Sequence, residues 1–157
     1  MSTRTRSARS DTAAGAAAGS RPVLLATLGV PFDKAAAAFA VESAVESGQA
    51  LIVANITRLE PLPMSVMLGY DALEELTPEL SVAVRAPAEL ARSLGVRVER
   101  LRVRSPRPVQ ALLQLVAERA AGLLVFGPDR GAISARRYHR AARALRHEAS
   151  CLVWLPE

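Results

Sequence analysis

Apolar residues in this chain gather in short runs of strand length, and the segments between those runs show helical spacing. The predicted strands cover residues 23–27, 51–55, 96–103, 122–126 and 151–155. The predicted helices cover residues 35–47, 77–94, a segment that begins at Ser105-Pro106, and 133–147. Strands that alternate with helices form parallel sheets with right-handed crossovers. We therefore predict an α/β fold, a three-layer sandwich in which a five-stranded, mainly parallel sheet carries helices on both faces.

Capping and breaking residues sharpen these boundaries. Asp33 is the predicted N-cap of the first helix, and Gly48 is placed to end it. Thr77 caps the next helix, which Pro87 either kinks or splits in two. The apolar alternation in residues 96–103 slips by one position at its centre, which indicates a strand near a sheet edge.

Two segments do not follow the alternating pattern. Residues 1–20 are small, polar and basic, so we expect a disordered basic tail ahead of a single domain at residues 21–157. Residues 57–77 contain two prolines and a glycine, and they predict an irregular excursion with a short helix at residues 71–76.

Composition narrows the class of protein. Half of the 157 residues are hydrophobic but only 4% are aromatic, so the core must be built from aliphatic side chains. No apolar run approaches the roughly 20 residues that span a bilayer, and no secretion signal is recognised. Cys151 is the only cysteine, and we expect it to be an inert thiol in the core. A reducing, cytoplasmic location is therefore predicted, without contact with a membrane.

The formal charge of +5 is carried almost wholly by arginine, because Lys34 is the only lysine. Arg136, Arg140 and Arg143 fall on one side of the last predicted helix. The opposite, apolar stripe of that helix consists of Ala135, Tyr138, Ala142 and Leu145. The basic side is either a solvated surface, as charged helix faces usually are, or a source of charge-assisted contacts to phosphate. Nucleic-acid binding is not expected, because the chain has no recognised motif and few aromatic residues for stacking.

Candidate chemical groups do not assemble into a catalytic or metal site. His139 and His147 lack an acidic partner at ligand spacing, so no metal site is predicted. Ser134 is not surrounded by a nucleophile-elbow pattern. Asp129 either orients Arg130 or caps the last helix, and capping is the simpler interpretation. We predict no catalytic residue and no enzyme activity.

Ligands of parallel α/β sheets bind at the carboxyl ends of the strands, near the point where the strand order reverses. In this sequence those ends are residues 27–30, Asn55 and residues 127–131. A glycine–proline turn, Gly29-Val30-Pro31, follows the first strand, and glycines bracket the loop after the fourth. These positions are where a ligand site is expected.

Over residues 21–156 the chain resembles the universal stress protein family. The likeness is carried by the turn at residues 29–31 before an Ala-rich helix, and by the segments ARSLGV (91–96), VAERAAGLLVFG (116–127) and EASCLVWLP (148–156). The resemblance implies that family's nucleotide-binding α-hydrolase-like fold. It also implies a stress-response or signalling function, and a homodimer formed through the C-terminal strand that contains Trp154.

ATP-binding members of that family carry Gly, two residues, Gly, nine residues and then Gly-Ser or Gly-Thr, so that bare backbone approaches the phosphates. This chain keeps Gly127 and Gly131 with three residues between them, and no glycine follows Gly131. The family's first strand usually ends in Asp-Gly-Ser-Pro. Here Leu28 replaces the acid and Val30 replaces the hydroxyl. The resemblance therefore implies weak ATP binding or none.

The residues that would line such a site share the carboxyl edge of the sheet or the helices that follow it. They are Thr27, Leu28, Val53, Gly127, Arg130, Gly131 and Arg140. We predict a non-catalytic module that needs no cofactor and acts through an unidentified protein partner. The alternative is an ATP-binding switch of the same family, in which arginine side chains replace the missing glycine-loop contacts to phosphate.

Overall fold

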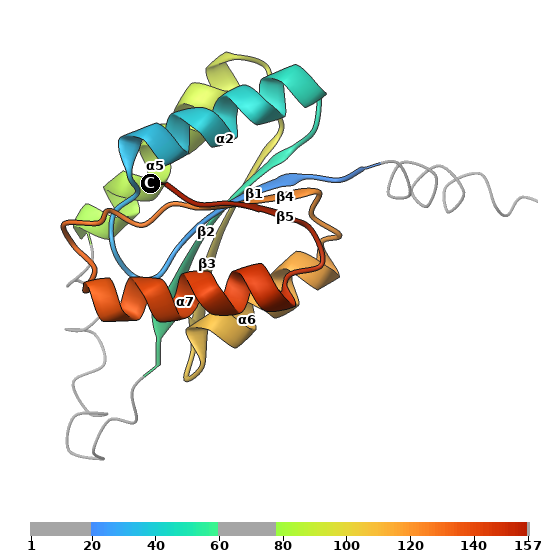
Figure 1. Cartoon of the computed structure of the whole chain (residues 1–157). Coiled ribbons are helices and arrows are strands. Elements are labelled where there is room, and N and C mark those ends of the chain that lie inside the picture. The colour runs from blue at the N-terminus through green and yellow to red at the C-terminus, as the bar shows by residue number, and fades with distance from the viewer. Residues whose placement is uncertain (1–19, 60–77, 157) are drawn as a thin grey trace, which may run out of the picture.

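The computed structural model describes residues 20–59 and 78–156, and it describes residues 78–84 by their backbone alone. Strands and helices alternate along the chain. The elements are β1 (Val23–Thr27), α2 (Lys34–Ser47), β2 (Leu51–Arg58), α5 (Pro78–Ser93), β3 (Val98–Ser105), α6 (Pro108–Glu118), β4 (Leu123–Phe126), α7 (Ala135–Glu148) and β5 (Leu152–Trp154). The parallel strands form one sheet in the order β3-β2-β1-β4-β5. Helices α2 and α5 cover one face of this sheet, and α6 and α7 cover the other (Figure 1). The predicted three-layer α/β fold is confirmed.

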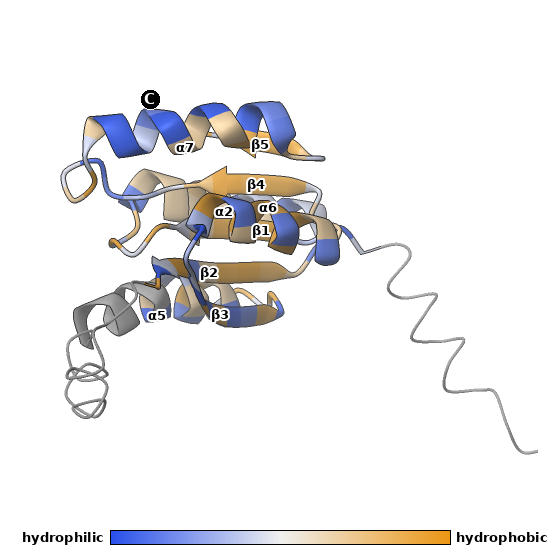
Figure 2. Cartoon of the chain, turned by 90° about the horizontal axis from the view of Figure 1, so that it is seen from below, coloured by the Kyte–Doolittle hydropathy of each residue, from blue (hydrophilic) through white to orange (hydrophobic). Residues whose placement is uncertain are grey.

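The central strands are buried on both faces, as a parallel sheet between two helix layers requires. All five residues of β1 are buried, and so are the first six of β2. The strands β2 and β4 are accordingly coloured as hydrophobic in Figure 2. Leu24, Leu28 and Phe126 face the α6 and α7 layer, whereas Leu25 and Val53 face the α2 and α5 layer. The sheet thus separates two aliphatic cores.

Local capping chemistry fixes the helix that follows β1. The Asp33 carboxylate accepts a hydrogen bond from the Ala36 amide at 2.9 Å, as predicted for an N-cap. Gly48 ends the helix in the left-handed conformation with φ of 67°, which glycine adopts without steric strain.

Several predicted boundaries are wrong. β2 continues to Arg58, three residues past its predicted end, because its neighbour β3 runs on to Ser105 and keeps pairing with it. Pro87 lies inside a continuous α5 and does not split it. α6 begins at Pro108 rather than at Ser105, since Pro108 occupies the first turn, where its missing amide is not needed. The predictions for residues 1–19, Thr77 and the helix at 71–76 lie outside the described residues.

Strand β3 lies at the edge of the sheet, as its slipped alternation predicted. The slip has a simple cause. Val98 faces the α2 and α5 layer, whereas Leu101 and Val103 face the α6 and α7 layer, so the apolar side of the strand changes without a bulge. In the described part of the chain, no helix has both the length and the apolar character needed to cross a membrane.

Candidate functional site

The strand order reverses between β1 and β4, so the loops that follow these two strands flank the expected ligand crevice. Two backbone hydrogen bonds tie the loops together. The Asp33 amide donates to the Gly127 carbonyl at 2.9 Å, and the Asp129 amide donates to the Pro31 carbonyl at 2.8 Å. Phe32 and Pro128 form an antiparallel bridge between these bonds. Backbone therefore bridges the crevice at the place where a ligand would enter.

Gly127 allows close packing between α2 and β4 at this junction. A Cβ atom added to Gly127 would overlap the Cβ atom of Ala36 in the first turn of α2. The Gly127 amide donates to the Ala26 carbonyl at 3.0 Å, so it is satisfied within the protein. The absence of a side chain at this position lets α2 approach β4, and it leaves no free amide at Gly127 for a phosphate.

Gly131 has an internal anionic partner. Its amide donates to Oδ1 of Asp129 at 2.9 Å, while the Asp129 carbonyl accepts from the Ala132 and Ile133 amides. The Asp129 carboxylate thus already accepts the hydrogen bond that the Gly131 amide would donate to a phosphate oxygen, and its negative charge would repel an incoming anion. The predicted capping role of Asp129 is wrong. Ser134 is the N-cap of α7, and its hydroxyl accepts from the Arg137 amide at 3.3 Å.

Leu28 and Thr27 end β1 beside these loops. The Leu28 side chain is 1% exposed and packs in the core beneath α6 and α7, so it does not stand in an open crevice. The Thr27 hydroxyl donates to the Val30 carbonyl at 2.9 Å and is used to close the turn. Both residues are therefore occupied by the fold itself.

Two members of the predicted set do not join the others. Val53 is fully buried in the middle of β2, where it is in register with Leu25 and contributes to the core beneath α2 and α5. Arg140 is exposed on α7, and within the described residues it makes no hydrogen bond or ion pair. Thr27, Leu28, Gly127, Arg130 and Gly131 do meet at the carboxyl edge of the sheet.

Asn55 was predicted to lie at this edge, but it was left out of the predicted lining residues. It is 2% exposed, and its Oδ1 accepts from the Gly29 amide at 2.9 Å. Gly29 has φ of 71°, so the Asn55 side chain stabilises a turn that glycine makes possible. A single amide side chain inside an otherwise apolar strand was the signal for this contact in the sequence.

Arg130 lies over an aromatic ring rather than beside Asp129. Its guanidinium carbon is 3.7 Å from the centroid of the Tyr138 ring, which also stacks on Phe126. The Tyr138 hydroxyl donates to the Pro156 carbonyl at 3.1 Å. A cation–π contact therefore holds the Arg130 side chain against Tyr138 of α7. The hydroxyl of the same tyrosine anchors the backbone just after β5.

Cys151 packs against the core on the α6 and α7 side as a half-buried free thiol. Burial raises the pKa of the Cys151 thiol, and a hydrogen bond with the backbone of Leu124 only partly offsets this rise. Because the thiolate is the reactive form, the raised pKa lowers the reactive fraction of Cys151 at neutral pH.

A model of the universal stress protein family matches residues 19–155. The chain belongs to the universal stress protein family. Solved members share its fold. A protein of this family from Burkholderia pseudomallei is 22% identical with a TM-score of 0.60, and the match covers 86% of this chain and 94% of that one. No match is found among proteins of curated function.

Two further structures of the family were solved with nucleotides. The Archaeoglobus fulgidus protein in complex with dAMP is 17% identical, with a TM-score of 0.57 over 87% of this chain and 98% of that one. An Arabidopsis thaliana member with AMP bound is 16% identical, with a TM-score of 0.54 over 86% and 89%. In this universal stress protein, the described residues contain no group of three side chains that could hold a metal ion.

Proposed function

We propose that this universal stress protein is a non-catalytic stress-response or signalling module that binds ATP weakly or not at all. One observation carries the proposal. In the loop at residues 127–131, the Asp129 carboxylate takes the place that a phosphate would need, since its Oδ1 accepts a hydrogen bond from the Gly131 amide at 2.9 Å. The joined loops and the buried Leu28 side chain support it. A protein built in this way acts through a partner protein rather than through bound nucleotide.

The alternative is an ATP-binding switch in which arginine replaces the lost backbone contacts. Its support is Arg130, which belongs to the loop itself and needs only to leave the Tyr138 ring to reach an anion there. The family members solved with dAMP and AMP show that this fold accepts adenine nucleotides in those proteins.

Titration with Mg-ATP separates the two functions. For the wild-type protein we expect no shift in melting temperature at about 1 mM Mg-ATP, because a ligand below its dissociation constant adds little stability. Asp129→Ala frees the Gly131 amide and removes a repelling charge, so it should tighten ATP binding by about tenfold or more. Isothermal titration calorimetry measures the dissociation constants, and a phosphate-release assay should detect no turnover for either protein.

Glu148→Ala is the matched control, because it removes one exposed carboxylate from the other end of α7. It should leave ATP binding unchanged. Micromolar binding of ATP to the wild type would overturn the proposal and favour the switch. Equal gains in Asp129→Ala and Glu148→Ala would show that net charge, rather than the loop contact, controls binding.

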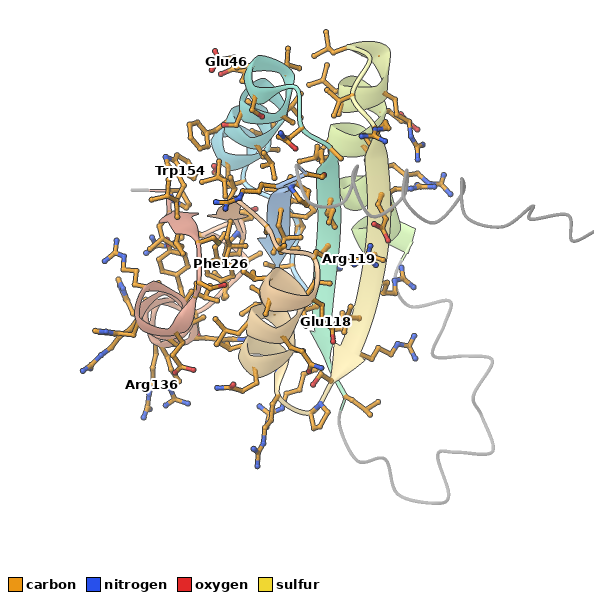
Figure 3. All side chains as sticks on the ribbon, turned by 90° about the vertical axis from the view of Figure 1, so that its right-hand side faces the viewer. Glu46, Glu118, Arg119, Phe126, Arg136 and Trp154 are labelled. Carbon is orange, nitrogen blue, oxygen red and sulfur yellow. The ribbon has the colours of Figure 1, made fainter. Side chains whose placement is uncertain are left out.

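We also propose a homodimer formed through β5. This strand is an edge of the sheet, and Leu152 on it is 75% exposed. Trp154, which is labelled in Figure 3, is half-buried. Its ring stacks on Phe39 of α2 with ring centroids 4.6 Å apart. An edge strand with exposed apolar side chains is a template for pairing with a second copy.

Sedimentation velocity tests this dimer. We expect the wild type to sediment as a dimer at micromolar concentration, and Leu152→Asp to sediment as a monomer, because the substitution places like charges across the two-fold interface. Leu94→Asp is the control, since Leu94 is 55% exposed but lies beyond the end of α5. A wild-type monomer, or dimer loss in both variants, contradicts an interface at β5.

We further propose a cytoplasmic location. Cys151 is the only cysteine of the chain, and partial burial raises the pKa of its free thiol. A domain that needs no intramolecular disulfide is suited to a reducing compartment.

A further inference from the structure

The outward side of α7 carries a straight line of basic side chains. Arg136, Arg140, Arg143 and His147 follow one another at spacings of four, three and four residues, so they lie within an arc of about 60° on the helix. All four are exposed, and Arg136 points away from the body of the protein (Figure 3). The line is about 16 Å long at the helical rise. We call Arg136, Arg140 and Arg143 the arginine stripe.

The arginine stripe is electrostatically unfavourable within the isolated domain. Its members are neighbours of like charge at i+3 and i+4, an arrangement that destabilises helices. Arg136 and Arg137 also lie in the first turn of α7, where the helix dipole is already positive and no acidic residue is present. Among the described residues the single ion pair joins Arg119 and Glu99, so no carboxylate neutralises the stripe.

Other exposed helix surfaces of the protein do not show this pattern. α2 carries Lys34 together with Glu42 and Glu46, and on α6 the Gln114 side chain donates to Glu118 at 2.9 Å, so neither helix has a row of basic side chains. On α7 the single acid is Glu148, at the last position. A surface that only needed solubility would mix both signs of charge. The composition of the arginine stripe is instead typical of a surface that binds an anionic partner.

We propose that the arginine stripe docks an acidic segment of a partner protein, a helix that presents carboxylates at the same i, i+4, i+7 spacing. This inference rests on the proposed function as a partner-binding module and names the partner's chemistry. Guanidinium groups bind carboxylates through paired hydrogen bonds, so a matching row of carboxylates satisfies each arginine in turn. Tyr138 is buried and cannot stack on bases, which favours a protein over a single-stranded nucleic acid. Arginine also binds phosphate and guanine, so the test below includes a DNA duplex as a competing ligand.

Fluorescence anisotropy with the full chain tests this surface. The probe is a labelled helical peptide of about 18 residues with glutamates in one stripe, compared with a peptide of the same composition whose glutamates are spread around the helix. The striped peptide should bind more tightly, and its affinity should fall as salt is raised from about 50 to 200 mM. A DNA duplex of about 20 base pairs serves as the competing polyanion.

A matched pair of triple variants localises the effect. Arg136→Gln, Arg140→Gln and Arg143→Gln together should weaken binding of the striped peptide by about tenfold or more, because three guanidinium–carboxylate pairs are lost. The control replaces Arg100, Arg102 and Arg104 with glutamine on edge strand β3. These arginines are also exposed, and replacing them removes the same charge as the α7 substitutions, but they lie on the face of β3 toward the α2 and α5 layer. The control should stay within about twofold of wild type.

The α7 triple variant should fold, because it relieves repulsion, and its melting temperature should equal or exceed that of the wild type. Three results would overturn the proposal: equal weakening by both triple variants, equal binding of both peptides, or tighter binding of the DNA duplex than of the striped peptide. None of these results depends on ATP, so failure here leaves the nucleotide titration to judge the proposed function separately.

Discussion

Replacing Leu28 with aspartate should lower the free energy of unfolding by about 4 kcal/mol or more, although this change restores the acid usual in the family. Leu28 is 1% exposed and packs with Phe126 and other apolar residues beneath α6 and α7. The variant loses the burial of a leucine, about 1.5–3 kcal/mol, and must also bury a carboxylate without a partner. Since domains of this size are stable by only about 5–15 kcal/mol, the variant should lose a large share of its stability and unfold at a much lower urea concentration than the wild type.

Urea denaturation at several pH values checks this result, with Leu28→Asn as the uncharged control. Burial raises the pKa of an aspartate in the folded state above its unfolded value, so the folded variant binds more protons and gains stability as the pH falls from about 7 towards 4. The gap between the Asp and Asn variants should therefore close at low pH. If Leu28→Asp is as stable as the wild type at pH 7, the side chain has access to water or to an acceptor, and an open crevice exists after all.

Local signals in the sequence were enough for the helices and strands. The Asp33 cap and the Gly48 terminator act on residues within one turn of themselves, so their roles can be read without knowing the rest of the fold. The end of β2 at Arg58 could not be read in this way. It depends on how far β3 continues beside it, and that length is a tertiary property.

The position of the candidate site was predicted from the sequence, but the hydrogen bonds that close it were not. The sequence placed Thr27, Leu28 and the loop at residues 127–131 at one edge of the sheet, and the structure brings them together there. The sequence could not show the hydrogen bonds between Asp33 and Gly127 or between Asp129 and Pro31. These bonds depend on the relative positions of two loops that are far apart in sequence. Val53 was misplaced because a strand's buried centre and its end look alike as aliphatic runs.

The observed contacts give a different explanation for the closed site from the one that the sequence suggested. The sequence attributed weak ATP binding to the altered glycine spacing and to the replacement of an acid by Leu28 and of a hydroxyl by Val30. In the structure Leu28 fills the core, while backbone bridges and the Asp129 carboxylate occupy the mouth. A substitution at Asp129 therefore tests binding, whereas a substitution at Leu28 tests folding.

The two glycines retained from the family pattern should respond to alanine to very different extents. Gly127→Ala should lower the free energy of unfolding by about 3 kcal/mol, because the new methyl group overlaps the Cβ of Ala36 and pushes α2 away from β4. That shift also strains the hydrogen bond from the Asp33 amide to the Gly127 carbonyl. Gly131→Ala should change stability by only about 0.5 kcal/mol, since a Cβ there meets only Oδ1 of Asp129 at 3.4 Å.

A double-mutant cycle in urea identifies the overlap as the cause. Ala36→Gly alone should destabilise by about 1 kcal/mol, because glycine is a poor helix former. Combined with Gly127→Ala it opens the space that the new methyl group needs, so the double variant should be more stable than Gly127→Ala alone. Strictly additive losses would mean that the two positions do not touch. Rescue would show that Gly127 is retained because α2 must pass close to it, a requirement that holds whether or not a nucleotide ever binds.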